Sequence, residues 1–145
     1  MTAEQIALVQ HSFQAVQPVL EQAASMFYDR LFELDPSLQR LFRSSRREQA
    51  GKLAQALTVV VTALDRPEQI RGAVESLGRR HAGYGVRDEH YSTVGEALIW
   101  TLARGLGDAF TPAVREAWGA AYGWLAFTMR RAAAKSPMEF SCVVR

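Results

Sequence analysis

The stretch LGRRHAGYGVRDEHYSTV, residues 77–94, decides the fold, because it places a histidine at the end of an apolar helical stripe. The stripe recurs at spacings of four, three and four residues and consists of Ile70, Val74, Leu77 and His81. These spacings put side chains on one face of a 3.6-residue helix. The imidazole of His81 is therefore expected to point where the apolar residues point.

Two glycines follow this histidine closely and mark the end of its helix. We expect Gly83 and Gly85 to take the left-handed conformations that stop a helix and turn the chain. A histidine in an apolar wall just before a helix stop suits an axial ligand to a planar metal cofactor. On spacing alone, a core histidine whose ring nitrogens are satisfied by the protein is the commoner alternative, and it stays open at this point.

Length and composition indicate one globular domain. A chain of 145 residues can bury a sizeable core, and its 48% hydrophobic and 22% charged residues are close to the globular average. The formal net charge of +2 is small and the basic residues are spread along the chain, so nucleic-acid binding gains no support. The single cysteine, Cys142, excludes an internal disulfide and a cysteine-based metal site within one chain.

No segment of the sequence looks like a targeting or membrane-spanning element. The start lacks a basic region followed by an apolar run, and no apolar stretch approaches the length needed to cross a bilayer. We therefore expect no membrane partner and a cytoplasmic location.

Apolar periodicity predicts an all-α chain of about six long helices and one or two short ones. The expected long helices span about 2–16, 18–34, 47–64, 67–82, 89–106 and 112–134, with a short helical turn after Pro36. No segment shows the strict alternation of a half-buried strand between turn signals. Helix starts are predicted from capping pairs, namely Thr2 with Gln5, Asp65 with Glu68, and Thr111 before Pro112.

The sequence changes character near its end. Ser136-Pro137 is expected to end the last helix, and the residues after it have no place in the predicted core. We therefore divide the chain into a domain at 1–135 and a tail at 136–145. The tail is interpreted as a disordered end, with a docking tail or a truncated linker as alternatives.

The sequence lacks the motifs of a phosphate-binding loop and of a zinc hydrolase. Gly51-Lys52 has no preceding glycine at the spacing of a phosphate-binding loop, and no histidine pair with a carboxylate has the spacing of a zinc hydrolase. The two remaining histidines, His11 and His90, are interpreted as solvated side chains.

Several separate motifs, in the right order and at the right distances, resemble one family. They are MFYDRLF at 26–32, Pro36 followed by LF at 41–42, Gln49 with Leu53, LGRRH at 77–81, VGEAL at 94–98, FTP at 110–112 and AWGAAYG at 117–123. Over roughly residues 1–134 the chain is similar to bacterial single-domain haemoglobins of the Vitreoscilla type and to the globin domain of flavohaemoglobins. From Leu77 onward there is a further likeness to neuroglobin.

The resemblance implies a globin fold around a pocket for haem b, iron protoporphyrin IX. It implies that His81 is the proximal ligand of the haem iron and that Phe42 stacks against the porphyrin. On the distal side, Tyr28 and Gln49 would face the iron-bound ligand, with Leu53 as the apolar wall beside it.

It also implies further contacts with the cofactor, for which we expect Leu77, Tyr84, Val86, Tyr91 and Val94. Lys52 is the best candidate for a haem propionate, with Arg46, Arg47 and Arg80 behind it. The ring N–H of His81 needs an acceptor, and the carbonyl of Leu77 lies one helical turn back. Flavohaemoglobins add a tyrosine and a glutamate on this side. Tyr91 matches the tyrosine, but Ala133 stands where the glutamate should be, which puts strong electron donation to the iron in doubt.

These residue types predict reversible, high-affinity binding of dioxygen. Oxygen on ferrous haem becomes a good hydrogen-bond acceptor, and two buried neutral donors, Tyr28 and Gln49, would each contribute about 1 kcal/mol or more. Carbon monoxide is less polar and should benefit less. No histidine occupies the distal position, so we expect a five-coordinate ferrous haem.

The runner-up function is a nitric oxide dioxygenase. Tyr28 and Gln49 would serve it equally, but the chain ends about where the reductase domain of a flavohaemoglobin would start, so a separate reductase is expected to supply the electrons. A haem-free sensor module is a weaker alternative, which His81 and Phe42 disfavour. As a binding protein it would store, deliver or sense its ligand, as a monomer or a homodimer.

Overall fold

A computed structural model describes the backbone of residues 1–144 and the side chains of residues 1–134. The long helices are α1 (Ala3–Val16), α2 (Leu20–Leu34), α3 (Arg46–Thr62), α4 (Pro67–Gly83), α5 (Asp88–Leu106) and α6 (Pro112–Val144). Short 3₁₀ helices are η1 (Gln17–Val19), η2 (Pro36–Leu41) and η3 (Gly107–Ala109). No strand occurs over residues 1–144, so the all-α prediction with six long helices is confirmed. Three short helices replace the one or two expected.

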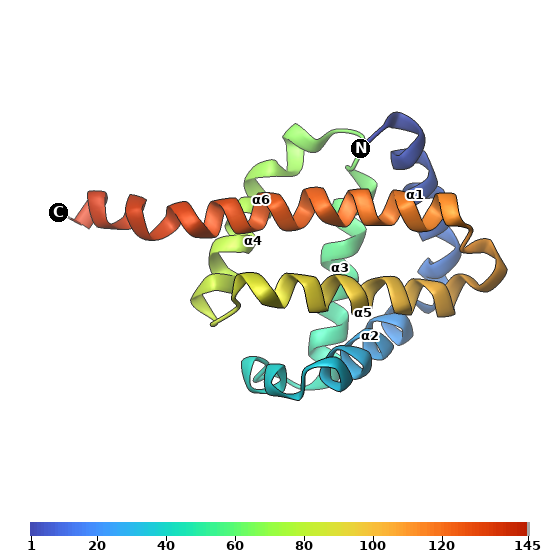
Figure 1. Cartoon of the computed structure of the whole chain (residues 1–145), viewed down its shortest axis with the longest axis horizontal. Helices are drawn as coiled ribbons and strands as arrows, with labels where there is room; N and C mark the ends of the chain where they lie inside the picture. Colours follow the sequence, from blue (N-terminus) through green and yellow to red (C-terminus); the bar gives the residue numbers. More distant parts are fainter. Residues whose placement is uncertain (145) are drawn as a thin grey trace.

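The helices form two crossing layers. In Figure 1, α5 and α6 run side by side in opposite directions, and α3 and α4 cross them steeply. Helix α4 packs mainly on α6, whereas α2 packs on both α3 and α5, and α1 packs on α6. Oblique crossings of this kind arise when the side-chain ridges of one helix fit the grooves of another.

One half of the interior, between α1, α5 and α6, is an apolar core that includes Val9, Leu102 and Trp118. Its one buried polar pair is satisfied, because the indole Nε1 of Trp118 donates to the Ser12 hydroxyl at 2.9 Å and Ser12 donates to the carbonyl of Leu8 at 2.7 Å. Buried polar groups that are paired in this way cost little. The other half of the interior, bounded by α2, α3, α4 and α5, contains the cavity described below.

Two glycines allow α4 and α5 to approach α6 closely. A Cβ at Gly78 would lie 2.3 Å from the backbone oxygen of Met129, and a Cβ at Gly95 would lie 2.9 Å from the ring of Tyr122. Neither position has room for a side chain. The packing of α4 on α6 depends on Gly78, and with it the position of His81, which lies one helical turn further along α4.

The predicted caps are confirmed at two helix starts and wrong at the third. Gln5 N–H donates to the Thr2 hydroxyl at 3.1 Å, and Val114 N–H donates to the Thr111 hydroxyl at 3.2 Å. Asp65 does not cap α4. That helix starts at Pro67, and the Asp65 carboxylate instead accepts a hydrogen bond from Gln10 of α1 at 3.1 Å. A long-range partner therefore replaces the local one.

The turn after α4 uses one of its two glycines in the expected way. Gly85 has a φ of +98°, whereas Gly83 is the last residue of α4 and has no positive φ. The prediction of a left-handed Gly83 is wrong, because α4 continues through this glycine and the chain turns only after it. The N–H of Val86 then bonds the carbonyl of His81 at 3.0 Å, which fixes the start of the connection to α5.

Helix α6 extends past the expected end. It runs through Ser136-Pro137 to Val144, and its last turns project beyond the other helices in Figure 1. A proline loses one helical hydrogen bond, but its φ near −65° fits a helix, and the alanines at 132–134 favour helical conformation. The division at 135 stays a prediction.

Over the described residues, none of the helices combines the length and the apolar character that crossing a bilayer requires.

Candidate functional site

A largely apolar cavity lies between α2, α3, α4 and α5 and reaches α6. The volume of this cavity is about 170 Å³. Its walls consist of Phe27, Tyr28, Leu31, Leu38, Leu41, Phe42, Leu53, Ala56, Leu57, Val60, Leu77, His81, Val86, His90, Tyr91, Val94, Leu98, Tyr122, Leu125 and Met129. A concave apolar pocket with a few polar groups is the usual form of a cofactor site.

His81 lines this cavity from the last turn of α4. Its Nδ1 lies 2.8 Å from the carbonyl oxygen of Leu77, so Nδ1 carries the proton and donates it. Burial lowers the pKa of His81 below its ordinary value, an effect that the bond to Leu77 opposes. The ring is therefore neutral near pH 7, and its Nε2 has a free lone pair. The predicted acceptor for His81, the Leu77 carbonyl, is the one found.

Tyr28 lines the cavity from α2 and is 7% exposed. Its ring packs edge-on against Phe27 and Phe42, with ring centroids 5.2 and 5.3 Å away. Burial raises the pKa of Tyr28 to about 12, although the nearby Arg46 lowers it. No hydrogen bond to the Tyr28 hydroxyl occurs within residues 1–134. A phenol that stays protonated and lacks a protein partner is a donor available to a ligand in the cavity.

Arg46 holds the start of α3 against α2. Its guanidinium pairs with Asp29, donates to the carbonyl of Ser25 at 3.3 Å, and lies 5.9 and 5.6 Å from the ring centroids of Tyr28 and Phe32. Cation–π contacts of this kind favour a fixed ring position. Its donors face Ser25 and Asp29 on α2, and the role of a propionate cation stays a prediction for Arg46.

Gln49 is buried but is absent from the cavity wall. Its amide nitrogen donates to the carbonyl of Ser44 at 2.8 Å, across the turn that precedes α3. Backbone carbonyls at such a turn need a partner, and the glutamine supplies it. The structure therefore does not bring Gln49 beside Tyr28.

Most of the other predicted residues meet in the cavity, but two do not. Phe42, Leu53, Leu77, Val86, Tyr91 and Val94 all lie in its wall. Tyr84 is 65% exposed and Lys52 is also exposed, and neither reaches the wall. Tyr84 follows the end of α4, where the ring turns outward to solvent. Lys52 lies one residue before Leu53, so it takes a different side of α3. Arg47 and Arg80 are exposed as well.

A tyrosine pair closes the wall near α6. Tyr122 donates from its hydroxyl to the backbone carbonyl of Tyr91 at 2.6 Å, and burial raises the pKa of Tyr122 far above its ordinary value. Burial also raises the pKa of Tyr91. Ala133 offers no carboxylate here. Over the described residues the only hydrogen bond to the ring of His81 is the one with Leu77.

His90 is a wall residue that the sequence analysis missed. It was expected to be solvated, yet it is only 7% exposed and lines the cavity from the first turn of α5. The signal was present, because His90, Val94 and Leu98 are spaced by four and share the inner face of α5. The charged residues around His90 concealed it. His11 is exposed, as expected.

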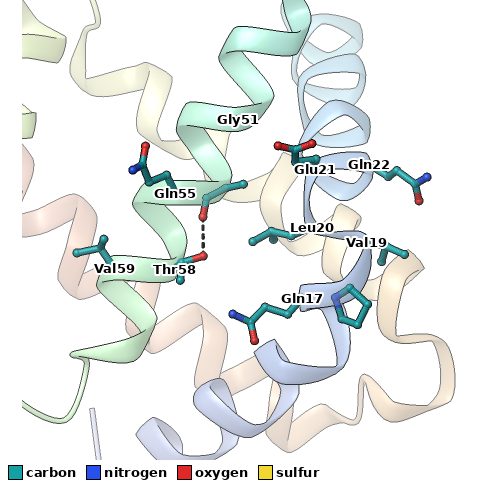
Figure 2. Close-up of a pocket in the computed structure, with 11 residues that line it drawn as sticks. Gln17, Val19, Leu20, Glu21, Gln22, Gly51, Gln55, Thr58 and Val59 are labelled. Carbon is teal, nitrogen blue, oxygen red and sulfur yellow. Dashed lines mark hydrogen bonds between the residues drawn. The ribbon is translucent and has the colours of Figure 1, made fainter.

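A second, more open concavity lies between the start of α2 and α3 (Figure 2). The polar ends of Gln22 and Gln55 point away from it, and the hydroxyl of Thr58 donates to the carbonyl of Ala54 at 2.8 Å. Its one ionisable group is Glu21. Over the described residues, no group of three histidine, cysteine or acidic side chains gathers as a metal site, so the cavity around His81 is the candidate site.

Comparison with known proteins gives the class. The globin family model matches residues 25–129. The flavohemoprotein of Deinococcus radiodurans is 36% identical over 133 residues, which cover 89% of this chain and 33% of that protein. An engineered carbene transferase from Rhodothermus marinus has a TM-score of 0.86 at 29% identity, covering 97% of this chain and 99% of that one. A bacterial globin from Campylobacter jejuni has a TM-score of 0.82 at 27% identity, covering 92% and 97%.

The fold and the histidine-bearing apolar cavity are those of a globin, and the chain belongs to the globin family. Within it, the chain is similar to bacterial flavohemoproteins, of whose length it spans a third or less. Globins hold haem through a proximal histidine. The residues present fit that group, because among the described side chains His81 Nε2 and the Tyr28 hydroxyl have no hydrogen-bond partner and both residues line one apolar cavity.

Proposed function

We propose that this globin binds haem b through His81 and reversibly binds dioxygen with high affinity. The observation that carries the proposal is the pairing of two groups on different walls of one cavity, the Nε2 of His81 on α4 and the hydroxyl of Tyr28 on α2. Ferrous haem supplies the chemistry of binding a diatomic gas. The chain supplies an axial nitrogen, an apolar enclosure and one hydrogen-bond donor.

The chain's own residues divide this work. The Leu77 carbonyl fixes the ring of His81 in the tautomer that leaves Nε2 free to bind metal. Leu53 and Phe42 keep water from the site, and Tyr28 donates to a polar gas molecule. The distal wall, formed by α2, η2 and α3, contains no histidine within the described residues, which supports a five-coordinate ferrous haem. A bis-histidine ferrous spectrum would contradict this.

The test is the absorption spectrum of the purified protein, reduced without oxygen and then exposed to air. An intense Soret band that shifts on exposure, and returns when oxygen is removed, supports reversible binding. No Soret band after haem is supplied would overturn the proposal. The same spectra are recorded with carbon monoxide, which is less polar than dioxygen, as a second ligand.

A second function, nitric oxide dioxygenation with an external reductase, is favoured by one observation. The Rhodothermus marinus protein, which matches nearly the whole chain, is described as a nitric oxide dioxygenase by provisional assignment. Against it, the His81 ring has no carboxylate partner within the described residues. Adding nitric oxide to the aerobic reduced protein separates the two functions. Stoichiometric nitrate and continued turnover with a bacterial flavin reductase would favour the enzyme, and absence of turnover would favour the binding protein.

Tyr28→Phe is expected to raise the rate of oxygen dissociation roughly five- to tenfold, since one neutral hydrogen bond contributes about 1 kcal/mol. Carbon monoxide dissociation should change less. Because burial raises the pKa of Tyr28 to about 12, wild-type oxygen dissociation should stay constant from pH 7 to about pH 10. Stopped-flow measurement of both gases checks this, and an equal effect on the two would argue against a hydrogen bond.

Gln49→Ala is expected to change oxygen dissociation by less than about twofold, because the amide bonds Ser44 and not the cavity. The same variant should lower the stability of the turn before α3, since it leaves a carbonyl unpaired. Stopped-flow and thermal unfolding measure the two effects separately. An oxygen effect as large as that of Tyr28→Phe would show that the glutamine turns into the cavity when a ligand is bound.

A further inference from the structure

His90 has one ring nitrogen fully committed to the backbone. Its Nδ1 accepts a hydrogen bond from the N–H of Arg87 at 3.0 Å, at the point where α5 begins. A nitrogen that accepts carries no proton, so the proton of the neutral ring is on Nε2. The local structure therefore fixes the tautomer of His90 and makes Nε2 a donor.

This donor is in the cavity wall without a protein acceptor. His90 is 7% exposed and lines the cavity, and within residues 1–134 no hydrogen bond to its Nε2 occurs. Over the described residues, Nε2 is not among the fully buried nitrogens and oxygens that lack a partner, so the atom is open to an acceptor brought by an occupant. Most of the other side chains in the wall, Val86 and Val94 among them, are apolar and offer no acceptor. An occupant of the cavity that places an acceptor at this point can therefore take up this donor.

One carboxylate of the protein lies near His90 and is already engaged. Asp35 accepts hydrogen bonds from the hydroxyl and the N–H of Ser37 at 2.6 and 3.1 Å. The pKa of Asp35 is lowered, first by the side-chain bond to Ser37. Asp35 is therefore the alternative acceptor that any test must separate from a ligand.

We propose that His90 is a positioning residue whose Nε2–H binds the carboxylate edge of the haem and so sets the rotation of that group relative to His81. The inference rests on the proposed function, which places haem in this cavity. It assigns the propionate contact to a neutral donor in the wall and not to Lys52, which is exposed. Haem carries the required acceptors, because its only charged substituents are two propionate carboxylates.

The experiment compares haem loss from wild type, His90→Phe and His90→Gln, measured as transfer to an excess of apomyoglobin. Each protein is loaded with haem or with haem dimethyl ester, which lacks the carboxylates. Hydrogen bonds to charged groups contribute about 1.5–3 kcal/mol. We therefore expect His90→Phe to lose haem roughly ten- to hundredfold faster than wild type. His90→Gln, which keeps a donor, should recover part of the difference, and with the ester wild type and His90→Phe should lose the cofactor at equal rates.

The other outcomes overturn the inference. If His90→Phe speeds the loss of haem and of the ester equally, the histidine acts only by starting α5. If Asp35→Asn speeds haem loss as much as His90→Phe does, the Nε2–H binds Asp35. If wild type holds haem and His90→Phe releases it at the same rate, the inference alone fails. If wild type shows no Soret band with haem, the proposed function fails first.

Discussion

His81→Ala is expected to lose the Soret band at micromolar protein concentration. We propose His81 as the ligand because its ring is the one imidazole that α4 places in the cavity wall, and α4 is fixed on α6 by the contact at Gly78. Losing a group that only orients a metal ligand costs roughly 10–100-fold in affinity, and losing the ligand itself should cost more. Titration of the purified protein with haem, followed by absorbance, measures the change.

Two further variants make this result specific. His81→Gly should regain the band when imidazole is added, because imidazole can occupy the space of the lost ring and supply the same nitrogen. His11→Ala, at an exposed position of α1, should match wild type. An unchanged band in His81→Ala would mean that another residue binds the iron.

Gly78→Ala is expected to lower the free energy of unfolding by about 3 kcal/mol or more, at the upper end of what overpacking usually costs. The added methyl group would lie 2.3, 2.6 and 2.8 Å from backbone atoms of Met129, which have no rotamer to relieve the contact. Helix α4 must then move away from α6. Urea unfolding followed by circular dichroism measures the loss, which corresponds to a fall of roughly 10 °C in Tm.

Gly72→Ala is the matched control on the same helix. A Cβ at this position meets nothing within 4 Å, so only helix propensity changes, and alanine should stabilise α4 by about 1 kcal/mol. Opposite signs for the two substitutions are the expected result. A Gly78→Ala protein within about 0.5 kcal/mol of wild type would contradict the close approach of α4 to α6.

The sequence predicted the helices and the place of His81 in an apolar wall well, because both follow from local periodicity. The stripe from Ile70 to His81 has one helical solution, and the structure contains it. Similarly, the Thr2 cap needs only a residue three positions away. These features depend on contacts within one helix, which spacing alone describes.

The errors have a common physical origin in competing partners from other parts of the chain. Asp65 was predicted to cap its own helix, but Gln10, distant in sequence, takes its carboxylate. Gln49 shares the predicted face of α3 with Leu53, but its amide donates to the carbonyl of Ser44 and does not line the cavity. His90 was judged by its charged neighbours, whereas its burial depends on helices packed against α5, among them α2. Sequence spacing predicts which residues share a face of one helix, but it does not predict which group on another helix or turn a polar side chain will bond.

The cavity also ties folding to cofactor supply. Its wall draws residues from α2, η2, α3, α4, α5 and α6, so unfolding of any one of these six helices would remove part of the wall. A molecule that occupies it binds the native chain and not the unfolded one, and at a concentration of about 100 times its Kd it adds about 2.7 kcal/mol to stability. The amount of this protein that survives proteolysis in a cell should therefore rise and fall with haem availability, with no change in the rate of its synthesis.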